Sequence, residues 1–322
     1  MRSLQDIRIP VEDSFKEFEK LYTFYITSSA STTNCLSNIC ITEGKRIRPL
    51  LVLLSAGLFG TPDEKAVKIA TAMEILHNTS LIHDDIVDNA TLRRNHKTLN
   101  ALTGNKIAVL TGDYLFAQVL KICADTCDIS VIQQMASVAK NMSEGELIQQ
   151  YASQHSLIDK STYFAIVERK TAMLMSHCCS MGGSCTGANR EQQQTLADFG
   201  TAIGTAFQIT DDILDYVGNK TGKKTGNDIR EHKITLPLIH ILEKSDESGR
   251  KSIMEHFTAD NQSRDDVDFV INKVVENGGI EYARQQTALY HQKALQMLEK
   301  LPQNPCNHSL KKLANFITQR NY

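Results

Sequence analysis

The sequence has no tryptophan, only six prolines, and no CxxC pair among its eight cysteines. With few prolines and few alternating β-branched runs, little in the chain interrupts helices or favours strands. Most apolar residues recur at spacings of three and four, which indicates an all-α fold. No cysteine and histidine set has the spacing of a zinc site, so we expect free thiols.

Strong net charge and long apolar runs are also missing. The formal net charge is -2, from 35 basic and 37 acidic residues, which gives no sign of a nucleic-acid partner. The longest apolar run that we identify, residues 49–60, is too short to span a bilayer. The first residues carry several charges and no apolar segment of the signal-peptide type. We therefore expect a soluble, cytoplasmic protein that forms one domain over residues 1–322.

Two copies of one acidic pattern are the most informative feature. They are DDIVD at residues 84–88 and DDILD at residues 211–215. Both continue an apolar helical stretch, so the first and last aspartates of each motif share a helix face. Such carboxylate clusters suit Mg²⁺, which takes one or two carboxylates, waters and phosphate oxygens. One copy alone would indicate a solvated acidic face, but two favour a pair of faces opposed across a cavity, holding Mg²⁺ on a diphosphate.

Cations accompany both motifs. Three of them lie within residues 44–48, just before a helix that can begin at Pro49, where free backbone N–H groups help to bind an anion. Arg93 and Arg94 follow the first motif within one short loop and could grip a metal-bound diphosphate. Residues 218–228, rich in glycine and lysine, follow the second motif and are expected to form a lid. The alternatives are solvated basic loops and structural salt bridges.

The apolar spacing predicts a series of helices. Gly182 and Gly183 are expected to end one of them, and residues 244–265 are expected to be loop-like or loosely helical. The predicted helices cover residues 1–30, 50–59, 63–89, 106–124, 131–151, 160–181, 195–215, 266–300 and 308–320.

Taken in order, these motifs resemble the all-trans polyprenyl diphosphate synthase family, of the medium- or long-chain type such as heptaprenyl and octaprenyl diphosphate synthases. The resemblance implies an all-α, single-domain helical bundle around a deep central cavity, and a homodimer. It implies a reaction in which an allylic diphosphate ionises, isopentenyl diphosphate attacks the cation and a proton is lost. The matching segments are GKRIRP at 44–49, DDIVD at 84–88, GDYLFA at 112–117, Lys-Thr at 170–171, FQITDDILD at 207–215 and KITLP at 233–237.

The resemblance also implies roles for the matching residues. Thr171 and Gln208 present oxygens towards the carbocation, and the released diphosphate takes the proton. Mg²⁺ on the allylic diphosphate is expected at Asp84, Asp85, Asp88, Asp211, Asp212 and Asp215. The same diphosphate is expected to be bound by Arg93, Lys170, Lys233 and either Lys223 or Lys224. Isopentenyl diphosphate is expected to be bound by Lys45, Arg48, His77 and Arg94.

Two small residues bear on product length. Thr79 and Ser80 lie five and four residues before Asp84, about one turn or roughly 6–7 Å deeper along the helix. Short-chain members of the family tend to have a bulky aromatic floor there. The small residues therefore predict a product longer than fifteen carbons, serving a quinone side chain. The floor would then lie deeper, near Leu76 or Met73, or on a facing helix.

Other functions remain open at this point. They are a geranylgeranyl diphosphate synthase, the catalytic half of an enzyme with a small partner subunit, and a terpene cyclase. A cyclase usually has an Asn/Ser/Glu second metal site where this chain repeats its acidic motif, and non-catalytic subunits tend to lose both motifs. His232 stands where the family often has glycine, which leaves the turn before Lys233 in question.

Overall fold

The computed structural model describes residues 2–27, 44–93, 96–157, 159–218, 225–259 and 261–318, with side chains from residue 4 onward. These residues are almost entirely helical, so the predicted all-α class is confirmed. Their two short strands, β1 (Leu92–Arg93) and β2 (His96–Lys97), form one antiparallel hairpin just after the first acidic motif.

The chain divides into two compact units, which we describe separately. Unit 1 comprises Met1–Lys140, Leu174–Gly200 and Met297–Leu313, and unit 2 comprises Asn141–Met173, Thr201–Gln296 and Ala314–Tyr322. Each acidic motif therefore lies in a different unit. The interpretation of residues 1–322 as one domain stays a prediction.

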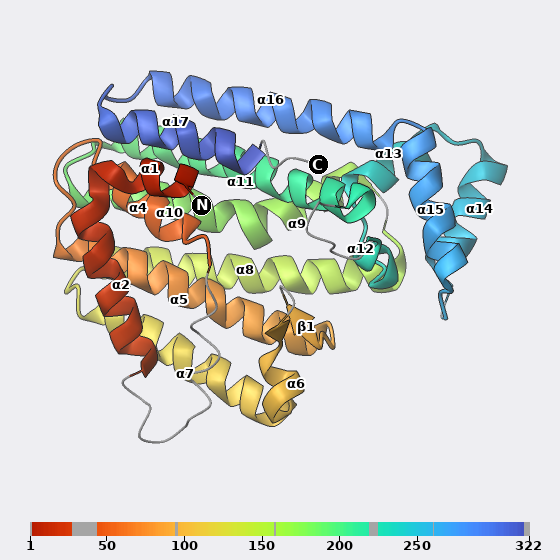
Figure 1. Cartoon of the computed structure of the whole chain (residues 1–322), viewed down its shortest axis with the longest axis horizontal. Helices are drawn as coiled ribbons and strands as arrows, with labels where there is room; N and C mark the ends of the chain where they lie inside the picture. Colours follow the sequence, from red (N-terminus) through yellow and green to blue (C-terminus); the bar gives the residue numbers. More distant parts are fainter. Residues whose placement is uncertain are drawn as a thin grey trace. The chain divides into compact units, whose positions relative to one another are not determined.

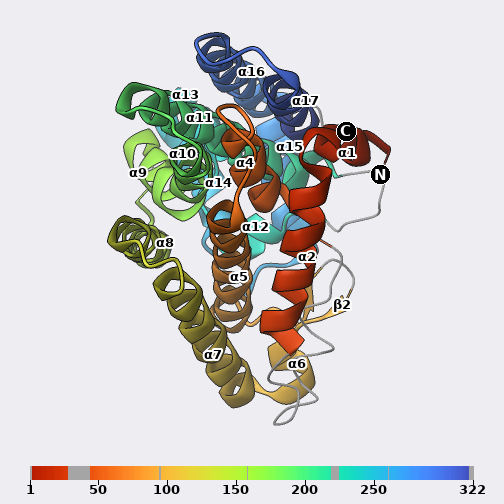
Figure 2. The same cartoon turned by 90° about the vertical axis from the view of Figure 1, so that its left-hand side faces the viewer.

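Unit 1 is built around one long helix that carries the first motif. Asp63 accepts a hydrogen bond from the Ala66 backbone N–H at 2.8 Å and so caps the first turn of α5 (Glu64–Val87). α5 packs between α2 (Glu12–Thr27) and α7 (Asn105–Ala124), as Figure 2 shows, and also against α4 (Ile47–Ala56). The middle part of α5 is buried, so neighbouring helices hold the helix that carries the first motif in place.

The remaining elements of unit 1 complete this core. The predicted single helix over residues 1–30 is wrong, because Pro10 lies in a 3-10 turn, η1 (Ile9–Val11), between α1 (Arg2–Arg8) and α2. The other helices wholly or partly in unit 1 are α6 (Leu99–Thr103), α8 (Ile129–His155), α10 (Met173–Cys185), α11 (Arg190–Val217), α16 (Gly279–Glu299) and α17 (Pro305–Thr318).

The glycine pair of α10 is a packing site rather than a helix end. α10 runs through Gly182 and Gly183 to Cys185, against our prediction. A Cβ atom on Gly182 would lie 2.2 Å from the carbonyl oxygen of Val52, so only glycine lets this helix approach the α4 backbone. The left-handed residue that follows the helix is Gly187, with φ 97°.

Unit 2 carries the second motif and a helical core of its own. The shared core includes Ile209, Ile213, Leu238, Val270 and Ala283. In Figure 1, α14 (Glu247–Phe257) and α15 (Arg264–Glu276) lie side by side. α14 is a regular helix within the stretch expected to be loop-like or loosely helical. The other elements are α9 (Lys160–Val167), a π-helical segment at Glu168–Ala172, α12 (Asn227–Arg230) and α13 (Leu236–Lys244).

α7 has an unusually apolar exposed face. By length and composition alone it is the one helix among the described residues that could cross a membrane, although such a test also selects core helices of soluble proteins. From the sequence we identified residues 49–60 as the longest apolar run; α7 is longer, although polar residues interrupt it. Leu110 is 56% exposed and Leu120 is 49% exposed on its surface.

The cysteines of the described residues are free, as expected. Cys123 is a buried core residue of α7, whereas Cys127 lies beyond the helix, is exposed, and has a left-handed φ of 52°.

Candidate active site

The cationic loop before α4 is anchored by one of its own arginines. Arg46 has a left-handed φ of 48° and donates from Nη1 to Glu74 Oε1 of α5 at 2.8 Å. Its guanidinium also lies 4.3 Å from the ring centroid of Tyr22, whose hydroxyl accepts a hydrogen bond from Asn78. Because Glu74 is buried, this pair fixes where the loop meets α5. From the sequence we counted Arg46 only among the cations of an anion-binding loop, and we assigned no role to Glu74.

Three of the residues predicted to bind isopentenyl diphosphate lie close to Arg46 or Glu74 in the sequence. Lys45 is exposed and Arg48 is half-buried, on either side of Arg46 and Ile47. His77 is half-buried on α5, three residues after Glu74 and therefore close to the same face. The Arg46–Glu74 pair thus joins the loop to the helix segment that carries His77. Arg94, the fourth predicted ligand, lies outside the described residues.

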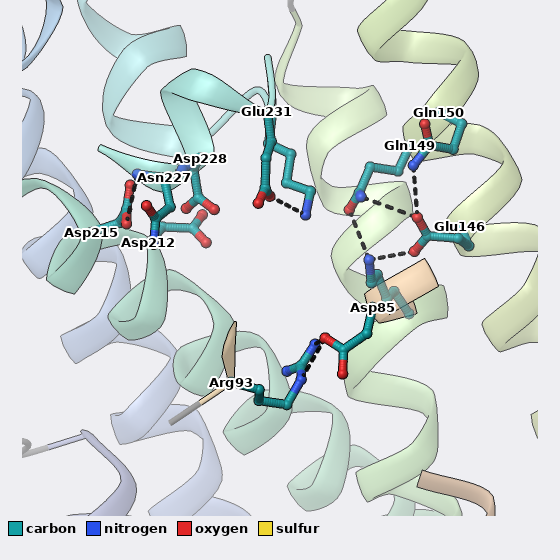
Figure 3. A network of polar contacts seen from close by, with 12 residues as sticks. Asp85, Arg93, Glu146, Gln149, Gln150, Asp212, Asp215, Asn227, Asp228 and Glu231 are labelled. Atoms are coloured by element: carbon teal, nitrogen blue, oxygen red, sulfur yellow. Dashed lines mark hydrogen bonds and ion pairs between the residues drawn. The ribbon is translucent and has the colours of Figure 1, made fainter. Parts of the chain in front are cut away.

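The first acidic motif forms the end of α5. Asp85 is buried and its Oδ1 accepts hydrogen bonds from Arg93, at 2.9 Å from Nε and 2.8 Å from Nη2. Figure 3 shows this pair. Asp84 and Asp88 are half-buried at the end of the helix. Arg93 therefore holds the β hairpin to the motif in this structure, and Asp85 is its partner.

The second motif contains a buried chain of hydrogen bonds. Asp212 accepts from the Tyr163 hydroxyl at 2.6 Å and from Gln208 Nε2 at 2.9 Å. The Thr171 hydroxyl in turn donates to Gln208 Oε1 at 2.9 Å. These contacts fix the orientation of the Gln208 amide, with its nitrogen towards the acidic motif and its oxygen towards Thr171.

Burial makes the negative charge of Asp212 costly. Desolvation raises the pKa of its carboxyl to about 6; the hydrogen bonds from Tyr163 and Gln208 oppose that rise, and the neighbouring charges of Asp211 and Asp215 add to it. Burial likewise raises the pKa of Asp228 well above its usual range, with Asp215 and Asp212 as further causes. A cation near these carboxylates would relieve this cost.

Asp215 brings Asp228 to the motif. Its two carboxylate oxygens accept the backbone N–H groups of Asn227 at 3.2 Å and of Asp228 at 3.0 Å (Figure 3). The start of α12 is thereby tied to α11. Lys233 follows on the same segment and forms an ion pair with Glu231 at 2.6 Å. Asp228 was not predicted as a site residue, because only the fold places it beside Asp212.

Lys170 lies in a locally wide helix turn. The π-helical segment Glu168–Ala172 contains both Lys170 and Thr171, and such segments often occur at functional sites. Lys170 pairs with Glu146 of α8 and donates to Gln149 Oε1 at 3.2 Å. A Cβ atom on Gly145 would lie 2.8 Å from the Lys170 backbone nitrogen, so glycine permits this contact. Sequence reasoning named neither Glu146 nor Gln149 as a site residue.

One pocket of unit 2 brings these groups together. It has a volume of about 730 Å³, counting space open to solvent. The polar part of its lining includes two cations, two carboxylates and two carbonyl- or hydroxyl-bearing side chains, and Leu157, Ile166 and Val167 supply an apolar part. These six residues are Lys170, Lys233, Asp212, Asp228, Thr171 and Gln208.

The aspartates offer the oxygen ligands that a hard divalent cation prefers, but they do not form a complete coordination shell. Within the described ranges, no three His, Cys, Asp or Glu side chains are grouped so that they could hold a metal ion. Mg²⁺ needs only one or two carboxylates if waters and substrate phosphate complete its shell, and the donors here are oxygens. Lys223 and Lys224, one of which was predicted to bind the diphosphate from a lid, lie outside the described residues.

The comparisons with known proteins agree with this architecture. The Polyprenyl synthetase family model matches residues 30–274. Heptaprenyl diphosphate synthase component 2 of Geobacillus stearothermophilus is 36% identical over 285 residues, which cover 87% of each chain. A decaprenyl diphosphate synthase structure from Rhodobacter capsulatus has a TM-score of 0.90 at 32% identity, covering 98% of this chain and 99% of that one. A polyprenyl synthase from Caulobacter crescentus, complexed with calcium and isoprenyl diphosphate, has a TM-score of 0.91 at 28% identity, covering 99% and 98%.

The fold and the polar pocket define an isoprenoid synthase that acts on diphosphates. The chain belongs to the polyprenyl synthetase family. It is a trans-prenyltransferase that condenses isopentenyl diphosphate with an allylic diphosphate to make a polyprenyl diphosphate.

Proposed function

We propose that the enzyme is Mg²⁺-dependent and that the unit 2 pocket binds the diphosphate end of the allylic substrate. The observation that carries this proposal is the presence of two cations and two carboxylates, buried Asp212 and half-buried Asp228, in the lining of that pocket. Lys170 and Lys233 match the negative charge of a diphosphate, and the carboxylates match a divalent cation that accompanies it. The calcium and isoprenyl diphosphate bound by the Caulobacter protein support both assignments.

The residues of the pocket can each take a definite part. Lys170 and Lys233 bind the departing diphosphate and stabilise its growing charge. Thr171 and Gln208 lie on the same lining, and their oxygens keep lone pairs that can stabilise a nearby carbocation. Mg²⁺ held in unit 2 by Asp211 and Asp212 would supply a Lewis acid for the leaving group, and Asp84 and Asp88 of unit 1 remain predicted Mg²⁺ ligands. Asp85 and Asp215 support these ligands by fixing the hairpin and α12.

The second diphosphate, of isopentenyl diphosphate, is proposed to bind at the cationic loop of unit 1. Lys45, Arg48 and His77 would contact it, held in place by the Arg46–Glu74 pair. Arg is suited to this task because its planar donors match phosphate oxygens. The substrate proton would then pass to the released diphosphate, since no side chain of this chain stands out as a base.

We propose a product of medium or long chain that serves a quinone, made in the cytoplasm with at most transient membrane contact. Thr79 is buried on α5 and its hydroxyl donates to the Ile75 carbonyl at 2.9 Å. The Ser80 hydroxyl donates to the His77 carbonyl at 2.9 Å. Both side chains therefore fold back on their own helix and leave little bulk in the path of a growing tail. Met73 and Leu76 are buried below them.

A second copy of the chain is proposed to cover the exposed apolar face of α7. Ile107, Val109, Leu110 and Leu120 are all exposed on this helix, and exposed apolar side chains that gather on one element can mark a protein interface. The name of one relative, heptaprenyl diphosphate synthase component 2, implies a further component of that enzyme, so a different partner subunit is the alternative occupant. Sedimentation of the purified chain separates the two, since a homodimer needs no added protein. Leu110→Glu should then give a monomer, and a wild-type chain that is monomeric at micromolar concentration would contradict the homodimer.

The role of the pocket can be tested with one pair of lysine variants. Lys233→Met should lower kcat/KM for farnesyl diphosphate by about tenfold or more, because a charge-assisted contact to the diphosphate is lost. Lys251→Met removes an exposed lysine of α14 and serves as the control. Activity should need Mg²⁺ and disappear with a chelator. Equal kinetics of both variants would argue against this diphosphate site.

A further inference from the structure

The turn that carries Lys233 contains a left-handed residue with a side chain. His232 has φ 52°, a region that glycine enters readily and most other residues avoid. The turn is tight, because the Lys233 N–H donates to the Asp228 carbonyl at 2.8 Å and the His232 N–H donates to the Ile229 carbonyl at 3.0 Å. A glycine could adopt this backbone conformation equally well, so the conformation alone does not account for a histidine at this position.

The imidazole ties the turn to the end of α14. His232 Nδ1 lies 2.7 Å from the carbonyl oxygen of Phe257, the last residue of that helix. A carbonyl can only accept, so Nδ1 carries the proton in this contact. The His232 ring also meets the Phe257 ring edge-on, with centroids 5.8 Å apart. The contact satisfies one of the terminal carbonyls that a helix leaves without an internal partner.

The Phe257 carbonyl oxygen accepts a second hydrogen bond, which fixes its position. Gln262 Nε2 donates to the Phe257 oxygen at 2.6 Å and to the His256 oxygen at 3.2 Å. Beside it, Asp266 accepts from Ser263 and His256 and caps the start of α15. The end of α14 and the start of α15 are therefore well braced. His232 therefore connects the turn to the hydrogen-bonded end of α14, not to a loosely held loop.

The opposite end of the segment is tied to α11. Asp215 accepts the N–H groups of Asn227 and Asp228, as Figure 3 shows. The segment 226–235 is thus held near its start by the second acidic motif, at His232 by Phe257, and at Thr235, whose Oγ1 lies 2.6 Å from the Tyr216 hydroxyl. Asp228 is part of the first tie and Lys233 directly follows His232, and both line the pocket. Loss of the His232 contact would leave the turn that carries Lys233 less firmly held.

We propose that His232 is a positioning residue for Lys233 and Asp228. Its Nδ1–H bond to Phe257 holds the turn in register, so that both side chains are presented to the pocket before the allylic diphosphate binds. The proposal rests on the assignment of Lys233 to that diphosphate. Preorganisation of this kind lowers the cost of ordering a binding group and so affects substrate affinity.

Two variants separate the backbone from the side chain. His232→Gly keeps the left-handed turn but removes the donor. His232→Asn keeps both, because asparagine tolerates this conformation and its Nδ2 is attached at the same position as the histidine Nδ1. Cys127→Gly is a matched control, since Cys127 is exposed, has the same φ of 52° and lies in unit 1.

The readouts are the two KM values, kcat and the thermal midpoint of the Mg²⁺-containing enzyme. His232→Gly should raise KM for farnesyl diphosphate by up to about tenfold, which corresponds to the loss of one partly buried hydrogen bond, while KM for isopentenyl diphosphate stays within about twofold. The thermal midpoint should move by only a few degrees, because relief of backbone strain offsets the lost bond. His232→Asn should restore most of the affinity, and Cys127→Gly should match the wild type.

Three outcomes would overturn the proposal. The first is a wild-type KM for farnesyl diphosphate in His232→Gly. The second is an equal rise in both KM values together with a large fall in the thermal midpoint, which would indicate a role in stability alone. The third is an Asn variant as defective as the Gly variant. If Lys233→Met also leaves the KM for farnesyl diphosphate unchanged, the diphosphate assignment itself fails, and that result is distinct from all three.

Discussion

Replacing Asp212 by asparagine should stabilise the metal-free enzyme while abolishing its activity. Asp212 is buried, and burial raises the pKa of its carboxyl from the ordinary value of 3.8 to about 6. An amide of the same shape carries no charge. It can still accept from Gln208 with its oxygen, and Tyr163 can turn its hydroxyl to accept from the amide nitrogen.

The sign and size of the effect follow from the raised pKa. The pKa of Asp212 is higher in the folded than in the unfolded protein, so the folded state is favoured, relative to its stability at high pH, when this carboxyl is protonated. That advantage is complete below the unfolded pKa and is lost as the pH rises through about 6. At pH 7.5 the ionised Asp212 therefore costs about 3 kcal/mol relative to a neutral side chain. At pH 5 the carboxyl is mostly protonated in the folded state, and the cost falls to about half of that value.

Urea unfolding in the presence of a chelator measures this difference. Asp212→Asn should exceed the wild type by about 3 kcal/mol at pH 7.5 and by clearly less at pH 5. Asp198→Asn, at an exposed position of the same helix, is the control and should change stability by less than about 0.5 kcal/mol. A gain that is independent of pH, or a loss at both pH values, would refute the account of a buried, strained charge.

Three further substitutions test other parts of the account. Glu74→Gln should lower the free energy of unfolding by about 3 kcal/mol and raise KM for isopentenyl diphosphate, because Arg46 loses its buried charged partner. Thermal unfolding measures the first effect and steady-state kinetics the second. An unchanged KM would show that the Arg46–Glu74 pair has no part in substrate binding. Gly145→Ala should lower kcat at least about tenfold, since its methyl group would displace Lys170; wild-type turnover would show that the contact is unimportant. Thr79→Phe should shorten the product, as resolved by chain length, and an active variant with unchanged product length would refute the position of the floor.

The helices were largely predictable because their cause is local. The apolar spacing of α5 and the absence of glycine and proline from it predicted a helix over residues 63–89, and the structure has Glu64–Val87. Local patterns failed where a distant contact decided the outcome. Gly182 ends no helix because its missing side chain makes room for the Val52 carbonyl.

The site residues divide in the same way. The acidic motifs could be found because four-residue spacing on a helix is visible in the sequence. Asp228, Glu146 and Glu74 could not be assigned, since each acquires its role from a residue far along the chain: Asp212, Lys170 and Arg46. The turn before Lys233 was in question because of His232, and its left-handed φ shows that histidine takes the conformation a glycine would take.

The most direct test of the central claim uses the purified chain alone, with Mg²⁺, labelled isopentenyl diphosphate and farnesyl diphosphate, and resolves the products by length. The account predicts products of thirty carbons or more without any added subunit. Products that stop at twenty carbons would contradict the argument from Thr79 and Ser80. No elongation from any allylic primer would contradict a self-sufficient synthase, and recovery of activity with a partner protein would then identify the chain as one half of a two-subunit enzyme.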